Sequence, residues 1–282
     1  RAVLVASAVV SDLTGRACNA VTTHWTDDSF ALASGTARTI TRGGKKTWFF
    51  LTSDYAFGTA MQRDATLAVT AEGGTVLGAA RHPPQGPDMS SFVTQAMASK
   101  AQVVGLANVG GDTINSIREA ASFGLTQSGQ SLAGLLVFIN DVHALGLKTA
   151  QGLLVTTGYY WDRDPATRAF AGRFQAQMGR PPSKAQAAVY AATKHWLKAV
   201  ASSGEVGGAA VTTAMKAIPA EYFGASAPIR PDGRVLYDIA LYQVKSPAES
   251  KGPWDYCSIV AQVAGPDAAK PLGQAGCPLV KA

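Results

Sequence analysis

A repeated order of strand and helix between residues 28 and 160 constrains the fold of this chain most. Short apolar runs are each followed by a polar turn and a helical pattern, at intervals of about 25–30 residues. The expected strands are 47–52, 75–80, 102–107, 132–139 and 152–157, and the expected helices are 28–42, 57–72, 90–100 and 113–123. This order is typical of βαβ units, so we predict an α/β fold with a parallel sheet flanked by helices.

The segment Trp48–Gly58 shows how one unit of this repeat is built. Its apolar start is too short for a helix and rich in aromatic residues, which predicts a buried strand. Thr52, Ser53 and Asp54 follow as a turn, with Asp54 the expected helix cap. Ligands of parallel sheets bind beyond the carboxyl ends of the strands. We therefore expect four polar tips to gather along one edge: 52–58, 108–112, 140–141 and 158–161.

After Trp161 the pattern changes to three helices, expected over 164–178, 183–201 and 209–217. The histidine- and proline-rich segment 82–88 and residues 246–253 are predicted as loops. Strands are expected at 3–8, 237–244 and 254–263. Three helices with almost no strand between them need a sheet supplied from elsewhere, such as strand 3–8 or residues before Arg1.

The amino-acid composition limits the kinds of protein that this chain can be. Hydrophobic residues make up 47% and charged residues 16%, as in a folded globular chain. The net charge of +6 is scattered, which argues against a nucleic-acid partner. No apolar run reaches ~18 residues, the length of a membrane-spanning helix. Arg1 followed by Ala2–Val10 mimics a signal peptide, but Val3–Val5 fits a buried strand equally well.

Motifs for catalysis and cofactors do not occur in the sequence. It contains no GxSxG, HExxH or GxGxxG pattern, and Gly43–Thr47 lacks the first glycine of a phosphate loop and precedes a strand. Ser, His and Asp are numerous, so counting alone leaves a catalytic triad open. The four histidines are dispersed and the three cysteines have no metal-site spacing, so we predict neither a metal nor a cofactor.

Several loose motifs occur in a specific order. They are Ala8–Thr14, Trp48–Gly58, Asp88–Phe92, Ala120–Leu125, Ala150–Leu153, Asp162–Pro165 and Gly233–Arg234. In this order they resemble the periplasmic solute-binding proteins of ABC transporters, of the leucine/isoleucine/valine-binding type with its relatives for amides and aromatic acids. The resemblance runs from the first residues to about residue 244.

This resemblance implies a type I periplasmic-binding-protein fold of two α/β lobes joined by three hinge crossings. Lobe I would contain 1–27 and 161–238 and would lack its N-terminal part, which suggests a truncated chain. Lobe II would contain 28–160 and 239–263, and 264–282 would form a tail. The implied function is that of a periplasmic, monomeric, non-enzymatic component of an importer. It would bind a small carboxylate in the cleft by hinge closure and deliver it to a membrane permease. A ligand-sensing receptor domain is the alternative, and an α/β enzyme is a weaker one.

Ligand residues implied by the resemblance come from both lobes. Ser7, Ala8 and Val9 match the loop that holds the ligand carboxylate through N–H groups and a hydroxyl, although Val9 stands where threonine is usual. Phe57 stands where tyrosine is frequent, which keeps the ring and removes the hydroxyl. Fewer hydroxyls with retained rings favour an aromatic or otherwise apolar carboxylate over a plain amino acid.

Other implied ligand residues have structural alternatives. Asn108 and Asp112 match a second loop of the cleft, and Asp141 matches the acidic residue that pairs with a ligand ammonium group or simply caps the next helix. Tyr159 and Tyr160 would either wall the ligand or pack at a crossing.

The cysteines leave three pairings open on sequence grounds. The resemblance implies a disulfide between Cys18 and Cys277, which would tie the tail to lobe I and leave Cys257 as the spare thiol.

Overall fold

The computed structural model describes residues 1–86 and 88–280, which divide into two compact units. Unit 1 contains residues 1–29 and 158–239 and the segment from 264 on, and unit 2 contains 30–157 and 240–263. Four links join the units: 29–30, 157–158, 239–240 and 263–264. The segment from Ala264 on groups with unit 1, so the chain passes between the units four times, where the sequence led us to expect three crossings and a tail.

Unit 2 is built on a seven-stranded sheet of order β11-β10-β7-β6-β5-β3-β4. The strands are β3 (Thr47–Ser53), β4 (Thr75–His82), β5 (Val103–Ala107), β6 (Ser131–Gly134), β7 (Leu154–Thr157), β10 (Ile239–Val244) and β11 (Cys257–Val263). Strands β4, β3, β5, β6 and β7 are parallel, and β10 runs antiparallel to β7. The predicted parallel α/β sheet is confirmed, with β10 as an antiparallel addition.

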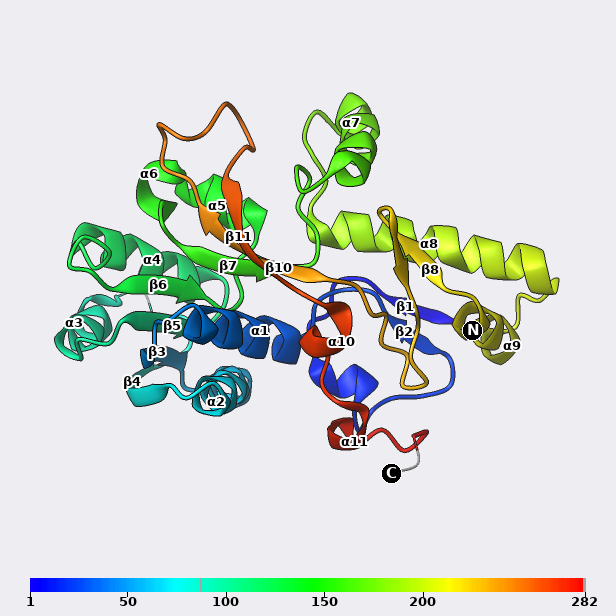
Figure 1. Cartoon of the computed structure of the whole chain (residues 1–282), viewed down its shortest axis with the longest axis horizontal. Coiled ribbons are helices and arrows are strands. Elements are labelled where there is room, and N and C mark those ends of the chain that lie inside the picture. The colour runs from blue at the N-terminus through cyan, green and yellow to red at the C-terminus, as the bar shows by residue number, and fades with distance from the viewer. Residues whose placement is uncertain (87, 281–282) are drawn as a thin grey trace. The chain divides into compact units, whose positions relative to one another are not determined.

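Helices cover both faces of this sheet (Figure 1). They are α1 (Ser29–Arg42), α2 (Ala56–Ala71), α3 (Ser90–Ala98), α4 (Gly111–Ser122), α5 (Ile139–Leu145) and α6 (Leu147–Ala150). Helices α1 and α2 lie on one face, and α3 and α4 lie on the other. Trp48 and Phe50 are fully buried, and the Trp48 indole donates a hydrogen bond to Thr41 of α1 (3.0 Å). The Trp48 indole therefore links β3 to α1.

The strand expected over 132–139 is shorter than predicted. Strand β6 ends at Gly134, where an added Cβ would lie 2.5 Å from the Val137 side chain. The chain turns back there, and Leu135 to Val137 stay buried outside the sheet before α5 begins. The apolar run that predicted a longer strand is thus a buried turn. The loop expected over 82–88 includes Pro87, which lies outside the described residues.

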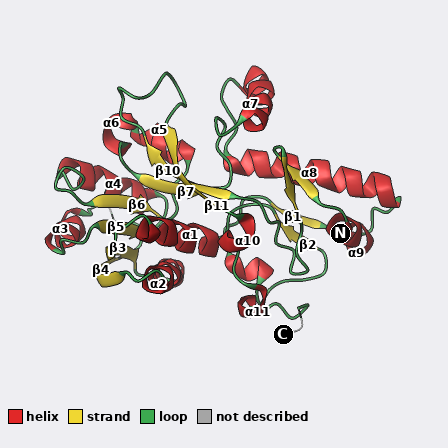
Figure 2. Cartoon of the chain, viewed as in Figure 1, coloured by secondary structure: helices red, strands yellow, loops and turns green. Residues whose placement is uncertain are grey.

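Unit 1 is mainly helical (Figure 2). Its helices are η1 (Ser11–Thr14, a 3-10 turn), α7 (Pro165–Met178), α8 (Lys184–Ser203), α9 (Gly208–Ala217), α10 (Gly265–Ala268) and α11 (Leu272–Ala275). Its strands form two pairs: β1 (Val3–Val5) parallel to β2 (Thr22–His24), and the hairpin of β8 (Ala220–Tyr222) and β9 (Ala225–Ala227). The hairpin, α10 and α11 were not expected from the sequence.

Local sequence signals explain where the long helices of unit 1 begin and end. The side chains of Asp164 and Ser183 accept hydrogen bonds from the N–H groups of Thr167 and Gln186, as N-caps do. Gly179 and Gly204 end α7 and α8 in the left-handed conformation, with φ of 70° and 71°. Both helices therefore begin and end where the sequence predicts, within three residues.

Candidate functional site

The carboxyl ends of β3, β4 and β5 meet at one edge of the unit 2 sheet, as the parallel order requires. Gly58 opens α2 so close to this edge that an added Cβ would lie 2.2 Å from the Ser53 carbonyl oxygen and 3.0 Å from that of Ala107. The expected tips 52–58 and 108–112 therefore lie side by side.

Asp112 joins three of the loops at this edge. Its Oδ2 accepts the backbone N–H of Gln85 (3.1 Å) and is 3.4 Å from the Ser53 hydroxyl. Partial burial raises the pKa of the Tyr55 phenol, and the nearby Asp112 carboxylate raises it further. Asp112 is only 6% exposed, and the partners named above are protein groups. Its side chain therefore holds the loops together.

Asn108 is fully buried and belongs to a second polar network. Its amide group donates to His82 Nε2 (3.1 Å) and to the Ser116 hydroxyl (3.0 Å), and its Oδ1 accepts from Thr113 (2.8 Å). These bonds connect the ends of β4 and β5 to α4. No sequence pattern indicated this role for His82, because its partner Asn108 lies 26 positions away.

Aromatic side chains supply the accessible part of this edge. The rings of Tyr55 and Phe57 have centroids 6.2 Å apart, and Tyr55 is 37% exposed while Phe57 is half-buried. Gly110 and Gly111, at the start of α4, are exposed. This edge thus offers two rings, a stretch of accessible backbone and the exposed Asp54–Arg81 ion pair, whereas Asp112 is buried.

Asp141 lies in the first turn of α5, apart from these networks. Its Oδ2 accepts the backbone N–H of Phe138 (2.9 Å), and burial raises the pKa of its carboxyl group. The contact matches the capping alternative noted for this residue.

In unit 1, the loop Ser7–Val9 is accessible and held from behind. Ser7 and Ala8 are exposed and Val9 is half-buried. His24 Nε2 lies 2.7 Å from the Ala8 carbonyl oxygen, and the Ser29 N–H donates to the Val9 carbonyl (2.6 Å). The carbonyl groups of Ala8 and Val9 are thereby hydrogen-bonded. The side chains of Ser7 and Ala8 remain exposed.

Tyr159 and Tyr160 are almost fully buried in unit 1, at 3% and 4% exposure. The Tyr159 ring packs on Phe223 (4.8 Å between centroids) and Phe170 (6.3 Å), and burial raises the pKa of its phenol. These contacts match the packing alternative.

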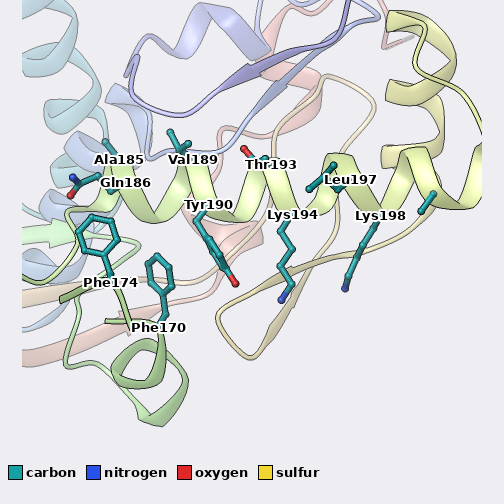
Figure 3. Close-up of a pocket in the computed structure, with 11 residues that line it drawn as sticks. Phe170, Phe174, Ala185, Gln186, Val189, Tyr190, Thr193, Lys194, Leu197 and Lys198 are labelled. Atoms are coloured by element: carbon teal, nitrogen blue, oxygen red, sulfur yellow. The ribbon is translucent and has the colours of Figure 1, made fainter. Parts of the chain in front are cut away.

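Unit 1 also carries an apolar groove of about 930 Å³ along α8, next to α7. Figure 3 shows its lining, and the Phe170 and Tyr190 rings lie 4.5 Å apart there. The apolar residues that define it are Phe170, Phe174, Val189, Tyr190 and Leu197. Its only charged lining residues are Lys194 and Lys198, and Lys194 forms an ion pair with Glu221. None of the candidate ligand residues lines this α7–α8 groove.

Two of the three cysteines form a disulfide. Cys18 and Cys277 form a disulfide with Cα atoms 5.6 Å apart, which is the pairing that the resemblance implies. Cys257 is a buried thiol whose pKa burial raises to about 12. Within residues 1–86 and 88–280, no cluster of three His, Cys, Asp or Glu could hold a metal ion, and no helix has the length and apolarity to cross a bilayer.

Comparison with known proteins shows which family shares this arrangement. The sequence pattern of the periplasmic binding protein family matches residues 1–253. A periplasmic binding protein from Burkholderia mallei is 46% identical with a TM-score of 0.86, and the match covers 98% of this chain and 72% of that one. A branched chain amino acid ABC transporter periplasmic ligand-binding protein from Burkholderia xenovorans is 33% identical with a TM-score of 0.92, over 97% and 74% of the two chains.

A third solved structure is the amino acid ABC transporter substrate-binding protein from Pseudomonas fluorescens. It is 25% identical with a TM-score of 0.88, over 96% of this chain and 73% of that one. No curated protein matches the chain. The fold, the match over residues 1–253 and the 46% identity together show that this chain belongs to the periplasmic binding protein family.

Proposed function

We propose that this chain is the extracytoplasmic solute-binding component of an ABC importer and that it binds a small carboxylate. The observation that carries the proposal is the 33% identity, over 97% of the chain, to a protein described as a branched chain amino acid ABC transporter periplasmic ligand-binding protein. In this proposal the chain works as a monomer, delivers its ligand to a membrane permease and catalyses no reaction.

Ser7, Ala8 and Val9 supply the carboxylate side of the proposed site. The loop is exposed at Ser7 and Ala8, and backbone N–H groups with a hydroxyl are suitable donors to an anion. Val9 offers no hydroxyl, so the loop recognises the carboxylate through fewer side-chain donors than a threonine would provide.

Phe57 and Tyr55 supply the apolar side of the proposed site. Their rings are the accessible aromatic surface at the carboxyl edge of the unit 2 sheet. Asp112 and Asn108 position these loops through the hydrogen bonds described above, and we assign them no direct contact with the ligand. Asp141 accepts the Phe138 N–H at the start of α5, and in this proposal it acts as a cap and not as the partner of a ligand ammonium group. The two accessible rings favour an aromatic or otherwise apolar carboxylate.

A ligand panel tests this proposal. Thermal-shift and calorimetric titrations would compare benzoate and 4-hydroxybenzoate with leucine, valine and phenylalanine. We expect the aromatic acids to raise the midpoint of unfolding, because a ligand that binds only the folded state stabilises it by mass action. If leucine and valine bind and the aromatic acids do not, the assigned ligand class is wrong. If no member of the panel binds, the proposed carboxylate site is wrong.

Phe57→Ala locates the site within unit 2. The variant should weaken the binding of the panel member that wild type binds by about 10-fold or more, since a ring contact is worth about 1–3 kcal/mol. Phe123→Ala is the matched control, because Phe123 is 43% exposed and follows the other end of α4. Equal affinities for wild type and Phe57→Ala would place the ligand away from this edge.

A further inference from the structure

Asp27 contacts the unit 1 ends of three of the four links between the units. Its Oδ2 accepts the backbone N–H of Gly158 (3.1 Å), and its Oδ1 accepts the hydroxyl of Tyr237 (3.1 Å). Asp27 itself precedes the 29–30 link, Gly158 follows the 157–158 link, and Tyr237 precedes the 239–240 link. Through these two bonds the Asp27 carboxylate connects three chain segments, its own included, that are more than 70 residues apart in sequence.

The fourth link is held at the same place. Gly265 follows the 263–264 link, and its N–H donates to Asp238 Oδ1 (2.9 Å). A Cβ added to Gly265 would lie 2.8 Å from the Tyr237 nitrogen, and one added to Gly158 would lie 2.3 Å from the Tyr237 ring. Both glycines are thus required by close approach, and Tyr237 is the common neighbour of the second and fourth links.

Buried charges support the Asp27 carboxylate. Lys184 of α8 lies 3.2 Å from Asp27 Oδ2, and both side chains are nearly inaccessible, at 10% and 2% exposure. Burial alone would raise the pKa of Asp27, but Lys184 and the Gly158 N–H outweigh it and the pKa is lowered. The carboxylate is therefore ionised at neutral pH, when charge-assisted hydrogen bonds to it are strongest.

The same segment also holds the candidate ligand loop. His24 and Ser29, on either side of Asp27, bond to the carbonyl groups of Ala8 and Val9. Arg234 adds a bond to the Thr26 carbonyl (2.6 Å), so residues 24–29 are fixed along their whole length. The ligand loop and the ends of the links consequently share one rigid support.

We propose that Asp27 is a positioning residue for ligand binding: with Tyr237, Gly158 and Lys184 it forms a clasp that fixes the unit 1 ends of the links. Motion between the units is then confined to the short links themselves, which is the behaviour of a hinge with a rigid base. The proposal rests on the proposed function for its meaning, because closure on a ligand is the motion that the clasp would guide.

Hydrogen exchange on the ligand-free protein tests the clasp. In Asp27→Asn the Gly158 amide loses its charged acceptor, and we expect its exchange to accelerate about 10-fold or more relative to amides in the core of α8. Tyr237→Phe is the milder variant: it removes one hydroxyl and keeps the ring that stacks on Tyr222 at 4.1 Å. It should accelerate the Gly158 and Gly265 amides by a smaller factor.

Two further variants separate positioning from general stability. Val211→Ala shortens a fully buried side chain of α9 away from the clasp, and it should lower stability while leaving the relative exchange of the Gly158 amide unchanged. Should Asp27→Asn fail to fold, Asp27→Asn with Lys184→Met removes both buried charges and keeps the shape. Its Gly158 amide should still exchange faster than in wild type.

Distances between spin labels at Ser202→Cys of unit 1 and Gln127→Cys of unit 2 give the second readout. The distance distribution should broaden in Asp27→Asn and in Tyr237→Phe, and it should keep the wild-type width in Val211→Ala. Unchanged distributions and unchanged Gly158 exchange in folded clasp variants would overturn the proposal. Because no ligand is added, this outcome is independent of whether the carboxylate panel succeeds.

Discussion

His24 makes the stability of unit 1 depend on pH in a calculable way. The side chain is fully buried. Burial, together with the positive charge of Arg234, lowers the pKa of the imidazole from 6.5 to about 4, although Asp28 and Asp27 act in the opposite direction. Its Nε2 lies 2.7 Å from the Ala8 carbonyl oxygen, and within the described residues Nδ1 has no hydrogen-bond partner. A second proton on the ring would therefore have no acceptor in this part of the chain.

The sign follows from the direction of the shift. Above pH 6.5 the imidazole is neutral in both states, so the folded state loses nothing. As the pH falls from 6.5 towards 4, the imidazole of His24 binds a proton in the unfolded state but stays neutral in the folded state. The free energy of unfolding therefore decreases. Between pH 7 and pH 5 the loss from this one residue is about 2 kcal/mol.

Urea unfolding at pH 7 and pH 5 measures this loss. Wild type should lose about 2 kcal/mol more than His24→Gln over this interval, because glutamine can still donate to the Ala8 carbonyl and does not titrate. His143→Gln is the control, since His143 is exposed on α5 of unit 2, and it should keep the wild-type dependence on pH. An equal loss in wild type and His24→Gln would refute the assignment.

Three further predictions concern the framework. Gly58→Ala should destabilise the protein by about 1–3 kcal/mol in urea titrations, since the new Cβ would meet the Ser53 carbonyl; a variant as stable as wild type would contradict the close packing of α2 on β3. Replacing Cys18 and Cys277 by serine should cost about 2–5 kcal/mol, and a reductant should lower the melting temperature of wild type but not of this variant. Cys257 should resist Ellman's reagent in the native protein and react after unfolding in urea, and rapid labelling of the native chain would show that the thiol is accessible.

The periodicity of the sequence predicted the parallel sheet of unit 2 because alternation of strand and helix is a local signal. It also predicted that four polar tips share one edge; 52–58 and 108–112 lie side by side there, whereas 158–161 belongs to unit 1. The periodicity could not predict the hydrogen bonds between these tips. Gln85 and Ser53 bond to Asp112 from loops that are distant in sequence and meet only in the folded chain.

Asp27 shows the limit most clearly. In the sequence it directly precedes the expected helix 28–42, whereas in the structure it accepts hydrogen bonds from Gly158 and Lys184, at separations of 131 and 157 residues. An unusual pair of adjacent acidic residues at the start of a helix was the only available signal. The same limit applies to Asp141, where the sequence left both a cap and a ligand contact open; the structure adds the capping contact with Phe138.

The disulfide between Cys18 and Cys277 closes the chain into a covalent ring that contains all of unit 2 and most of unit 1. A protease that cuts once, at any exposed loop between these cysteines, opens the ring without releasing a fragment. The nicked protein keeps its mass in a non-reducing gel and separates into two pieces only when a reductant is added. A single cut would therefore leave unit 1 and unit 2 covalently joined.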